Sequence, residues 1–269
     1  MKLVSSAKLR KAQNAIEAMR PYEEQLLGIL ASLQGGMVGV SSLNLGKNKD
    51  ERKTIVAIAS NSSLCGGFNA NAIAKVRAIR RPGDTVYAIG RKMADAMRKE
   101  GFASPEDFSA LSEHPSYGPA AALVEKLVAD VEAGRTGAVV LVYNHFVSTA
   151  RQEPVVEVLM QRETPDQVGG DRGAEERDSS PAPSYIAPLL EPSRTALLEA
   201  LVPKTRKLKL YAALLDSAAA EHAARTVAMQ TATDNAENLL AELTLQYNKG
   251  RQQKITSEIL DLAGGQAEN

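Results

Sequence analysis

The residues best suited to chemistry lie in a glycine-rich loop, SNSSLCGGFN, at positions 60–69. A glycine-rich loop between a strand and a helix can hold a phosphate group with its backbone N–H groups. However, the chain has neither a G-x-x-x-x-G-K-[ST] nor a G-x-G-x-x-G pattern here, and no Lys stands where it would meet a phosphate. Gly66 and Gly67 are therefore interpreted as a structural loop that turns tightly and lets the next helix pack close to a sheet.

Cysteine and histidine offer no catalytic or metal-binding arrangement. The single Cys, Cys65, excludes an internal disulfide and a multi-Cys zinc site, and we interpret it as a buried structural thiol because no His lies near it in sequence. His114, His145 and His222 are too scattered for a metal cluster. His114 and His145 have no evident partner, and His222 is predicted to be a packed polar residue. The sequence thus predicts no cofactor, no metal and no catalytic residues.

The elements that position these residues begin with a very long C-terminal helix. Residues 204–262 contain no Pro and only one Gly, Gly250, so one helix of roughly 85–90 Å is expected at 1.5 Å per residue. Steps of four and three residues define a coiled-coil seam over about four heptads. Its members are Leu215, Ala219, His222, Thr226, Met229, Thr233, Ala236, Leu240, Leu243 and Tyr247. The small residues in the middle predict a slim and modestly stable helix pair.

The N-terminal region supplies a partner with the same spacing. Its seam residues are Ser5, Leu9, Ala12, Ile16, Met19, Glu23, Leu26, Leu30 and Leu33. Gly35 and Gly36 end this helix, and Pro21 is expected to bend it. The two helices are predicted to pair antiparallel. Each alone is compatible with a buried helix of a globular bundle, but the length of the C-terminal helix argues against that alternative.

Between the two helices the composition indicates a small α/β domain. Buried strands are predicted at 54–59, 84–89 and 138–143, helices at 69–81, 91–99 and 120–131, and an antiparallel edge strand at 155–159. The fold class is therefore α/β, with a small sheet domain inserted between long helices that form an antiparallel coiled coil. The predicted divisions are 1–50, 51–190 and 191–269, and an acidic, flexible loop is expected at 163–184.

Composition and charge narrow the possible functions. The 269 residues include 32 Lys plus Arg and 32 Asp plus Glu, and this zero net charge disfavours general nucleic-acid binding. No run of about 18 apolar residues occurs and the start lacks a signal-peptide pattern, so a soluble, intracellular protein is expected. The first twenty residues are locally basic, with five cations against Glu17. Lys2, Lys8, Arg10, Lys11 and Arg20 form either a solvated helix face or a basic collar for acidic protein surfaces.

Three stretches resemble one family, the gamma subunit of the rotary F-type ATP synthase. They are residues 1–12 (MKLVSSAKLRKA), residues 64–69 (LCGGFN), and residues 224–235 (ARTVAMQTATDN) continuing to 247–256 (YNKGRQQKIT) and 258–259. The spacing agrees along the whole chain. Departures include about twenty family residues expected before Met1, residues 60–63 in place of S-D-R-G, Gln230 in place of Lys, and Gly250 in place of Ala. The inserted cysteine pair of the chloroplast form is absent, so thiol control is not expected.

The resemblance implies a non-catalytic central rotor that couples ion flow to ATP synthesis and helps to regulate ATPase activity. Its expected partners are the alpha and beta subunits, which the coiled coil enters, and the epsilon subunit and proteolipid c-ring, on which the α/β domain and the lower coil rest. One copy per complex is expected, at the cytoplasmic face of the bacterial inner membrane and without membrane insertion. In the family, a polar contact with the catalytic ring matches Arg251, Gln252 and Thr256. Ile255, Ile259, Leu260 and Leu262 suit an apolar bearing.

Two other classes of function share some of these features. A coiled-coil scaffold or adaptor would have the long helices without the specific C-terminal run. An enzyme that uses the α/β domain would need a polar pocket, which the sequence does not reveal. Co-purification would discriminate them, because a gamma subunit should come with alpha and beta subunits, a scaffold with other partners, and an enzyme alone.

Overall fold

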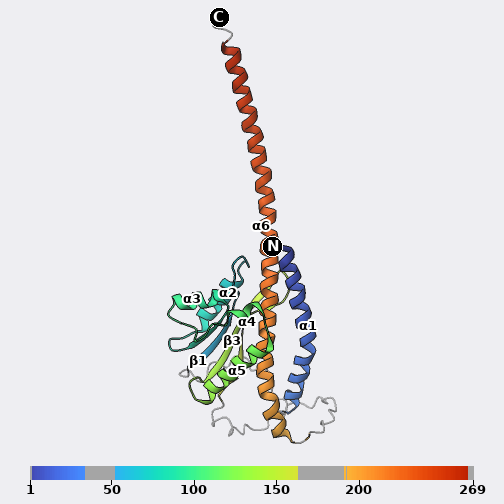
Figure 1. Ribbon diagram of the computed structural model, residues 1–269, viewed down its shortest axis with the longest axis vertical. Helices are drawn as coiled ribbons and strands as arrows, with labels where there is room; N and C mark the ends of the chain where they lie inside the picture. The colour runs from blue at the N-terminus through green and yellow to red at the C-terminus, as the bar shows by residue number, and fades with distance from the viewer. Residues whose placement is uncertain (1, 34–51, 163–190, 192, 266–269) are drawn as a thin grey trace, which may run out of the picture.

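The computed structural model describes residues 2–33, 52–162, 191 and 193–265 (Figure 1). The helices are α1 (Lys2–Leu33), α2 (Phe68–Ile79), α3 (Arg91–Lys99), α4 (Ser109–Glu113), α5 (Tyr117–Glu132) and α6 (Arg194–Gly265). The strands are β1 (Lys53–Ile58), β2 (Thr85–Ile89), β3 (Ala138–Phe146) and β4 (Gln152–Gln161). An α/β domain thus lies between two long helices, which confirms the predicted fold class.

One four-stranded sheet, in the order β2-β1-β3-β4, forms the centre of the domain. The strand β1 is parallel to both of its neighbours, and β4 is antiparallel to β3 at the edge. All six residues of β1 are buried, as the apolar run predicts for a central parallel strand. The predicted antiparallel edge strand is confirmed, although it is ten residues long rather than five.

The two faces of the sheet are covered by different helices. Successive side chains of a strand point to opposite faces, so Ile55 and Ala57 pack with Met93 and Met97 toward α2 and α3. On the other face, Val56 packs with Leu210 of α6 in a core that α5 also lines. The long helix α6 is therefore part of the core of the domain and not merely attached to it.

The helices α1 and α6 run antiparallel, with the N-terminus of α1 beside the middle of α6 (Figure 1). Leu9 packs against Ala219 and Ala223, whereas Glu23 and Lys209 share one cavity nearer the start of α6. Every predicted seam residue of α1 is buried or half-buried. The predicted antiparallel pairing is confirmed.

The seam of α6 divides into two parts. From 205 to 230 every residue except Val227 is at least half-buried, and we call these residues the paired part. From 231 to 260 every residue is exposed, and we call 231–265 the free part. The predicted seam residues Thr233, Ala236, Leu240, Leu243 and Tyr247 lie on the free part, so they have no partner among the described residues.

Some predicted boundaries were wrong. The helix α6 begins at Arg194, before the Pro-free run from 204 and close to the predicted division at 191, because it continues through Pro203. Helix α1 continues through Pro21, and the bend expected there stays a prediction. The short helix α4 was not predicted, and β3 extends to Phe146. The predicted acidic loop at 163–184 lies outside the described residues. Among the described helices, none is both long enough and apolar enough to cross a membrane.

Candidate functional site

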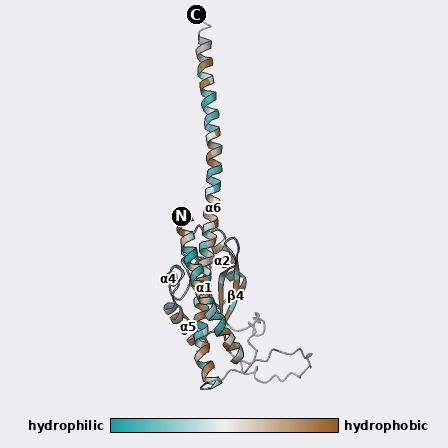
Figure 2. Cartoon of the chain, turned by 90° about the vertical axis from the view of Figure 1, so that its right-hand side faces the viewer, coloured by the Kyte–Doolittle hydropathy of each residue, from teal (hydrophilic) through white to brown (hydrophobic). Residues whose placement is uncertain are grey.

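The free part of α6 is an isolated helix that carries both apolar and polar side chains on its surface. Figure 2 shows hydrophobic and hydrophilic residues interspersed along it. Its large exposed apolar residues are Leu239, Leu240, Leu243, Leu245, Tyr247, Ile255, Ile259 and Leu260, which are 45–70% exposed. Apolar side chains at this density on a free helix are typical of a surface that another protein covers.

The polar residues singled out by the resemblance lie on this free part. Arg251, Gln252 and Thr256 are all exposed. The Thr256 hydroxyl donates a hydrogen bond of 2.8 Å to the backbone carbonyl of Gln252, so the two residues share one side of the helix, as their spacing predicts. Leu262 belongs to α6, but its side chain lies outside the described residues.

The basic residues of the N-terminal helix are exposed where they can be described. Lys8, Arg10 and Lys11 are exposed on α1, and the side chain of Lys2 lies outside the described residues. Lys8, Arg10 and Lys11 form no ion pair with another residue that the structure describes. Both sequence-based interpretations, a solvated face and a basic collar, therefore remain predictions.

The glycine-rich loop packs against α6. Cys65 is 2% exposed and joins Phe68, Ala220 and Ala224 in one apolar cluster. Gly66 has a positive φ of 56°, and a Cβ there would stand 4.0 Å from the Cβ of Ala228. Cys65 is thus buried as expected, and α6 packs against the loop. The structural role of Cys65 and Gly66 stays a prediction, which this packing supports.

The role predicted for Gly67 is only partly right. Its φ of −79° lies in the right-handed region that any residue can adopt, and it precedes α2 as the N-cap. The left-handed backbone is at Leu64 and Gly66 instead. The tight turn therefore depends on Gly66, and Gly67 needs only a small residue beside Asn71.

One hydrogen bond joins this loop to α6 at the upper end of the paired part, from an arginine that also forms an ion pair within α6. Arg225 donates to the Ser62 hydroxyl at 2.9 Å and forms a buried ion pair with Glu221 at 2.7 Å. Burial raises the pKa of Glu221, and Arg225 opposes that shift. The neighbouring His222 is half-buried, and burial followed by Arg225 and Lys8 lowers its pKa to about 4. His222 is thus a packed, neutral seam residue, as predicted.

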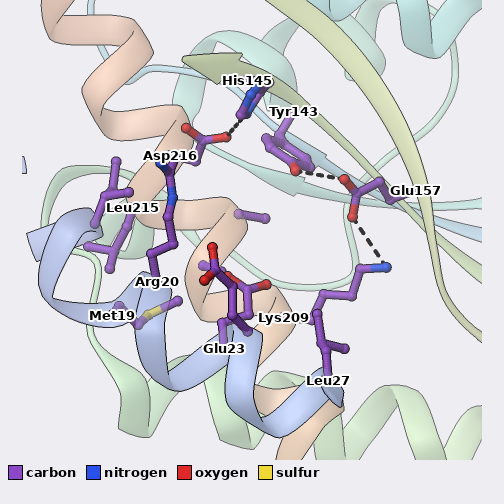
Figure 3. A pocket seen from close by; sticks show the side chains of 14 residues that line it. Met19, Arg20, Glu23, Leu27, Tyr143, His145, Glu157, Lys209, Leu215 and Asp216 are labelled. Carbon is purple, nitrogen blue, oxygen red and sulfur yellow. Dashed lines mark hydrogen bonds and ion pairs between the residues drawn. The ribbon is translucent and has the colours of Figure 1, made fainter. Parts of the chain in front are cut away.

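A polar cavity of about 270 Å³ lies where α1, α6 and the sheet meet (Figure 3). The prediction that His145 has no partner was wrong, because its Nδ1 lies 2.5 Å from Asp216 Oδ2. Tyr143 donates to Glu157 at 2.9 Å, and Lys209 Nζ lies 3.2 Å from the same carboxylate. Sequence reasoning missed this cluster because its members come from three distant segments.

Burial dominates the electrostatics of this cavity. Desolvation raises the pKa of Glu23 on α1, and the nearby Glu157 and Asp216 carboxylates add to the rise. Desolvation also raises the pKa of Asp216, against the lowering effect of His145. Burial thus favours the neutral forms of Glu23 and Asp216, whereas Glu157 is paired with Lys209. This junction, which consists of Glu23, His145, Glu157, Lys209 and Asp216, joins the coil to the sheet.

The described residues hold no group of three or more His, Cys, Asp or Glu side chains arranged to bind a metal ion. The fold defines a stalk-like protein. An α/β domain is packed against a pair of antiparallel helices, and one of these helices, α6, extends beyond the domain as the free part.

Comparison with known proteins agrees with this class. The family described as ATP synthase matches residues 1–267. The ATP synthase gamma chain of Phocaeicola vulgatus is 44% identical over 98% of this chain and 91% of its own length. That of Pelotomaculum thermopropionicum is 36% identical over 99% and 91%. The chain therefore belongs to the ATP synthase gamma chain family, which forms the central stalk of the F-type ATP synthase.

Solved structures show the same fold at lower sequence identity. A chain of the Euglena gracilis mitochondrial ATP synthase aligns with a TM-score of 0.62 and 21% identity, over 97% of this chain and 94% of that one. A chain of the Tetrahymena thermophila central stalk and c-ring structure aligns with a TM-score of 0.60 and 19% identity, over 87% and 97%.

Proposed function

We propose that this chain is the rotating shaft that couples ion flow through a proteolipid ring to ATP synthesis in an alpha/beta head. The observation that carries the proposal is the free part of α6, a helix exposed all round from 231 to 260 yet rich in large apolar residues. At 1.5 Å per residue, residues 231–265 span about 50 Å. A rod of this length and surface fits the bore of a ring of subunits.

The attachment of the free part to the domain suits the transmission of torque. Helix α6 is continuous from the core residues Leu210 and Leu214 into the free part. The glycine-rich loop and helix α1 hold its paired part from two sides. A rotation of the α/β domain would therefore turn the free part with it, and each orientation of its unequal faces would favour a different conformation of the surrounding subunits.

The chain itself is proposed to be non-catalytic. The sequence revealed no polar pocket, whereas the structure has one at the junction. Two of its carboxylates are paired, Asp216 with His145 and Glu157 with Lys209. The glycine-rich loop, the other candidate, packs against α6 rather than facing an open phosphate site. Both features support a structural role for the polar residues that could otherwise suggest an enzyme.

The contacts with the head are proposed to lie near the end of the free part. Arg251 offers a planar set of donors to a carboxylate, and Gln252 adds neutral hydrogen bonds. Ile255 and Ile259 are 45% and 59% exposed, and with Leu262 they would form an apolar bearing that slides without fixed polar bonds. The basic residues Lys8, Arg10 and Lys11 would face acidic surfaces at the entrance of the bore.

The α/β domain is proposed to rest, with an epsilon subunit, on the proteolipid ring at the cytoplasmic face of a bacterial inner membrane. The similarity to bacterial gamma chains supports this location. The chain would be peripheral and present once per complex, because a single shaft fits one bore.

Rotation of the assembled complex tests the proposal. The chain is co-expressed with alpha and beta subunits, and a bead is attached to the α/β domain at Lys99 on the exposed end of α3. ATP-dependent, unidirectional rotation is expected. Complexes in which the chain is truncated after Gln230, and which are otherwise identical, should lose sustained rotation because the free part is missing. Assembly with full ATPase activity but no rotation of the full-length chain would contradict the proposal.

A further inference from the structure

A second cavity, of about 220 Å³, lies at the edge of the sheet where β1 and β3 begin and β4 ends. Three arginines line it, and each lies next to the end of a different strand. They are Arg52 before β1, Arg135 in the turn between α5 and β3, and Arg162 after β4. The rest of the lining is Gly134, Thr136 and Gly137. We call these six residues the arginine pocket.

The arginine pocket lies at the end of the domain away from the free part of α6. Asp216 of α6 contacts His145 of β3, and His145 lies opposite Glu153 of β4 in the register of the sheet. Lys209, earlier in α6, donates to the Val158 carbonyl at 3.1 Å. Later residues of β4 therefore lie beside earlier residues of α6. Arg162 directly follows β4 and so continues this direction, away from the free part of α6.

Backbone hydrogen bonds hold the three arginine-bearing segments together. The Gly137 N–H donates to the Arg52 carbonyl at 2.9 Å, and the Arg162 N–H donates to the Gly137 carbonyl at 2.8 Å. The buried Thr136 hydroxyl also donates to the Arg52 carbonyl, at 3.1 Å. The arginine side chains thus start from fixed neighbouring points, so little backbone ordering would oppose their convergence on one ligand.

The charge of the pocket is not balanced. Arg135 pairs with Asp130, with Nε and Nη2 at 2.9 and 2.5 Å from Oδ1, and Asp130 also accepts a hydrogen bond from Tyr87. Among the residues that the structure describes, neither Arg52 nor Arg162 has an acidic partner. Three guanidinium groups against one carboxylate leave an excess of two positive charges.

The turn beside the pocket brings a guanidinium close to the backbone. Gly134 has a φ of +70°, and a Cβ at this position would stand 3.4 Å from Arg162 Nη1. The missing side chain therefore lets the Arg162 guanidinium lie against the turn. Guanidinium groups are planar, permanently charged and matched in geometry to pairs of phosphate oxygens. Several of them around one cavity favour a multiply charged tetrahedral oxyanion over a single carboxylate.

We propose that the arginine pocket is a binding site for a phosphate group. The group could belong to free phosphate or a soluble phosphomonoester, or to the headgroup of an anionic lipid. The proposal rests on the geometry of the chain alone and stands apart from the rotor function. If the rotor function also holds, the pocket lies on the side of the domain that faces away from the catalytic head.

Calorimetric titration of the full-length chain with inorganic phosphate at low ionic strength tests the site. The test variant is Arg52→Gln with Arg162→Gln. The matched control is Arg151→Gln, an exposed arginine at the opposite end of β4 that pairs with Glu153. Saturable binding is expected, and each lost charge-assisted contact should weaken it about tenfold. The control should bind like the unaltered chain. Circular dichroism and the melting temperature show whether each variant is folded.

Flotation with phosphatidylcholine vesicles, with and without phosphatidic acid, identifies the source of the phosphate. Pocket-dependent binding to the acidic vesicles that inorganic phosphate displaces would support a lipid headgroup. Pocket-dependent binding of inorganic phosphate without vesicle binding would support a soluble phosphate. The proposal is overturned if neither probe binds saturably. It is also overturned if the double variant and the Arg151→Gln control change the affinity for phosphate by the same factor.

Discussion

The paired part and the free part of α6 belong to one continuous helix but differ in what surrounds them. In the paired part, Ala219, Ala220, Ala223 and Ala224 are buried against α1 and the glycine-rich loop. In the free part, much larger residues such as Leu240 stay exposed. Small residues let secondary structures of the same chain approach closely, whereas the large exposed residues have no such neighbour. The difference indicates that the free part presents large apolar side chains for which the described residues provide no cover.

This comparison also explains why one heptad pattern can have two outcomes. The spacing of four and three residues continues from Leu215 to Tyr247, but α1 accompanies only the first half of it in the described structure. A seam defines which face of a helix is apolar, not which molecule covers that face. The described residues supply no partner for the second half.

The largest expected difference between the two parts is the effect of a Leu→Ala substitution on the free energy of unfolding. Leu214→Ala in the paired part removes a side chain that is 1% exposed within the core, and should lower the free energy of unfolding by about 2–5 kcal/mol. Leu243→Ala in the free part, where the side chain is 53% exposed, should change it by less than about 0.5 kcal/mol. Chemical denaturation of both variants measures this. Equal losses would show that the free part folds against the domain in solution.

A double change at the end of the free part should affect coupling and not folding. Arg251→Ala with Gln252→Ala removes hydrogen-bonding groups worth about 1.5–3 kcal/mol in a contact with a charged partner. ATP-driven proton pumping by the reconstituted complex should fall several-fold, with the circular dichroism of the chain unchanged. The matched control, Lys249→Ala with Gln253→Ala, changes two other exposed residues of the same turns. Unimpaired pumping by the first variant would mean that Arg251 and Gln252 are only a solvated face.

The junction should make the docking of α1 on the paired part depend on pH. The pKa of Glu23 is raised in the folded chain by burial and by Glu157. The folded state therefore binds more protons than the unfolded state between the ordinary and the raised pKa, and stability falls as pH rises through that window. Arg20, Lys209, His145 and Asp216 also face this group.

Glu23→Gln should remove this dependence, because the amide cannot ionise. The variant should become more stable than the unaltered chain as pH rises above the ordinary carboxyl range, by about 0.2–1 kcal/mol as expected for a partly exposed charge. Toward lower pH the two chains should converge. Thermal melts at several pH values measure the difference, with Glu24→Gln, an exposed neighbour on α1, as the control. A difference that stays constant with pH would rule out ionisation as its cause.

The most local expected effect lies in the free part. Gly250 is helical and exposed, and a Cβ there would meet nothing within 4 Å. Gly250→Ala should stabilise this segment by about 0.5–1 kcal/mol. Hydrogen exchange of the amides around it should slow by roughly two- to fivefold, with the global melting temperature unchanged. An increase in the global melting temperature would instead show that the free part unfolds together with the domain.

Periodicity in the sequence was enough to predict the main elements. The apolar run around Val56 predicted the central strand, and the weaker alternation at 155–159 predicted the antiparallel edge, because burial on two faces or one leaves different patterns. The seams of α1 and of the paired part of α6, and the burial of Cys65, were also predicted. The Pro-free run from 204 underestimated the length of α6, which continues through Pro203, since packing in the tertiary structure maintains a helix that local propensity disfavours.

What the sequence alone determined about this protein is thus its elements, their apolar faces and its resemblance to one family. Only the tertiary structure decided where the seam of α6 loses its partner, since that depends on how far α1 reaches along it. It also brought Glu23, His145 and Asp216 into one junction, and Arg52, Arg135 and Arg162 into one pocket. The physical reason is the same in each case: these groups lie far apart along the chain, and electrostatic and packing energies depend on distance in space.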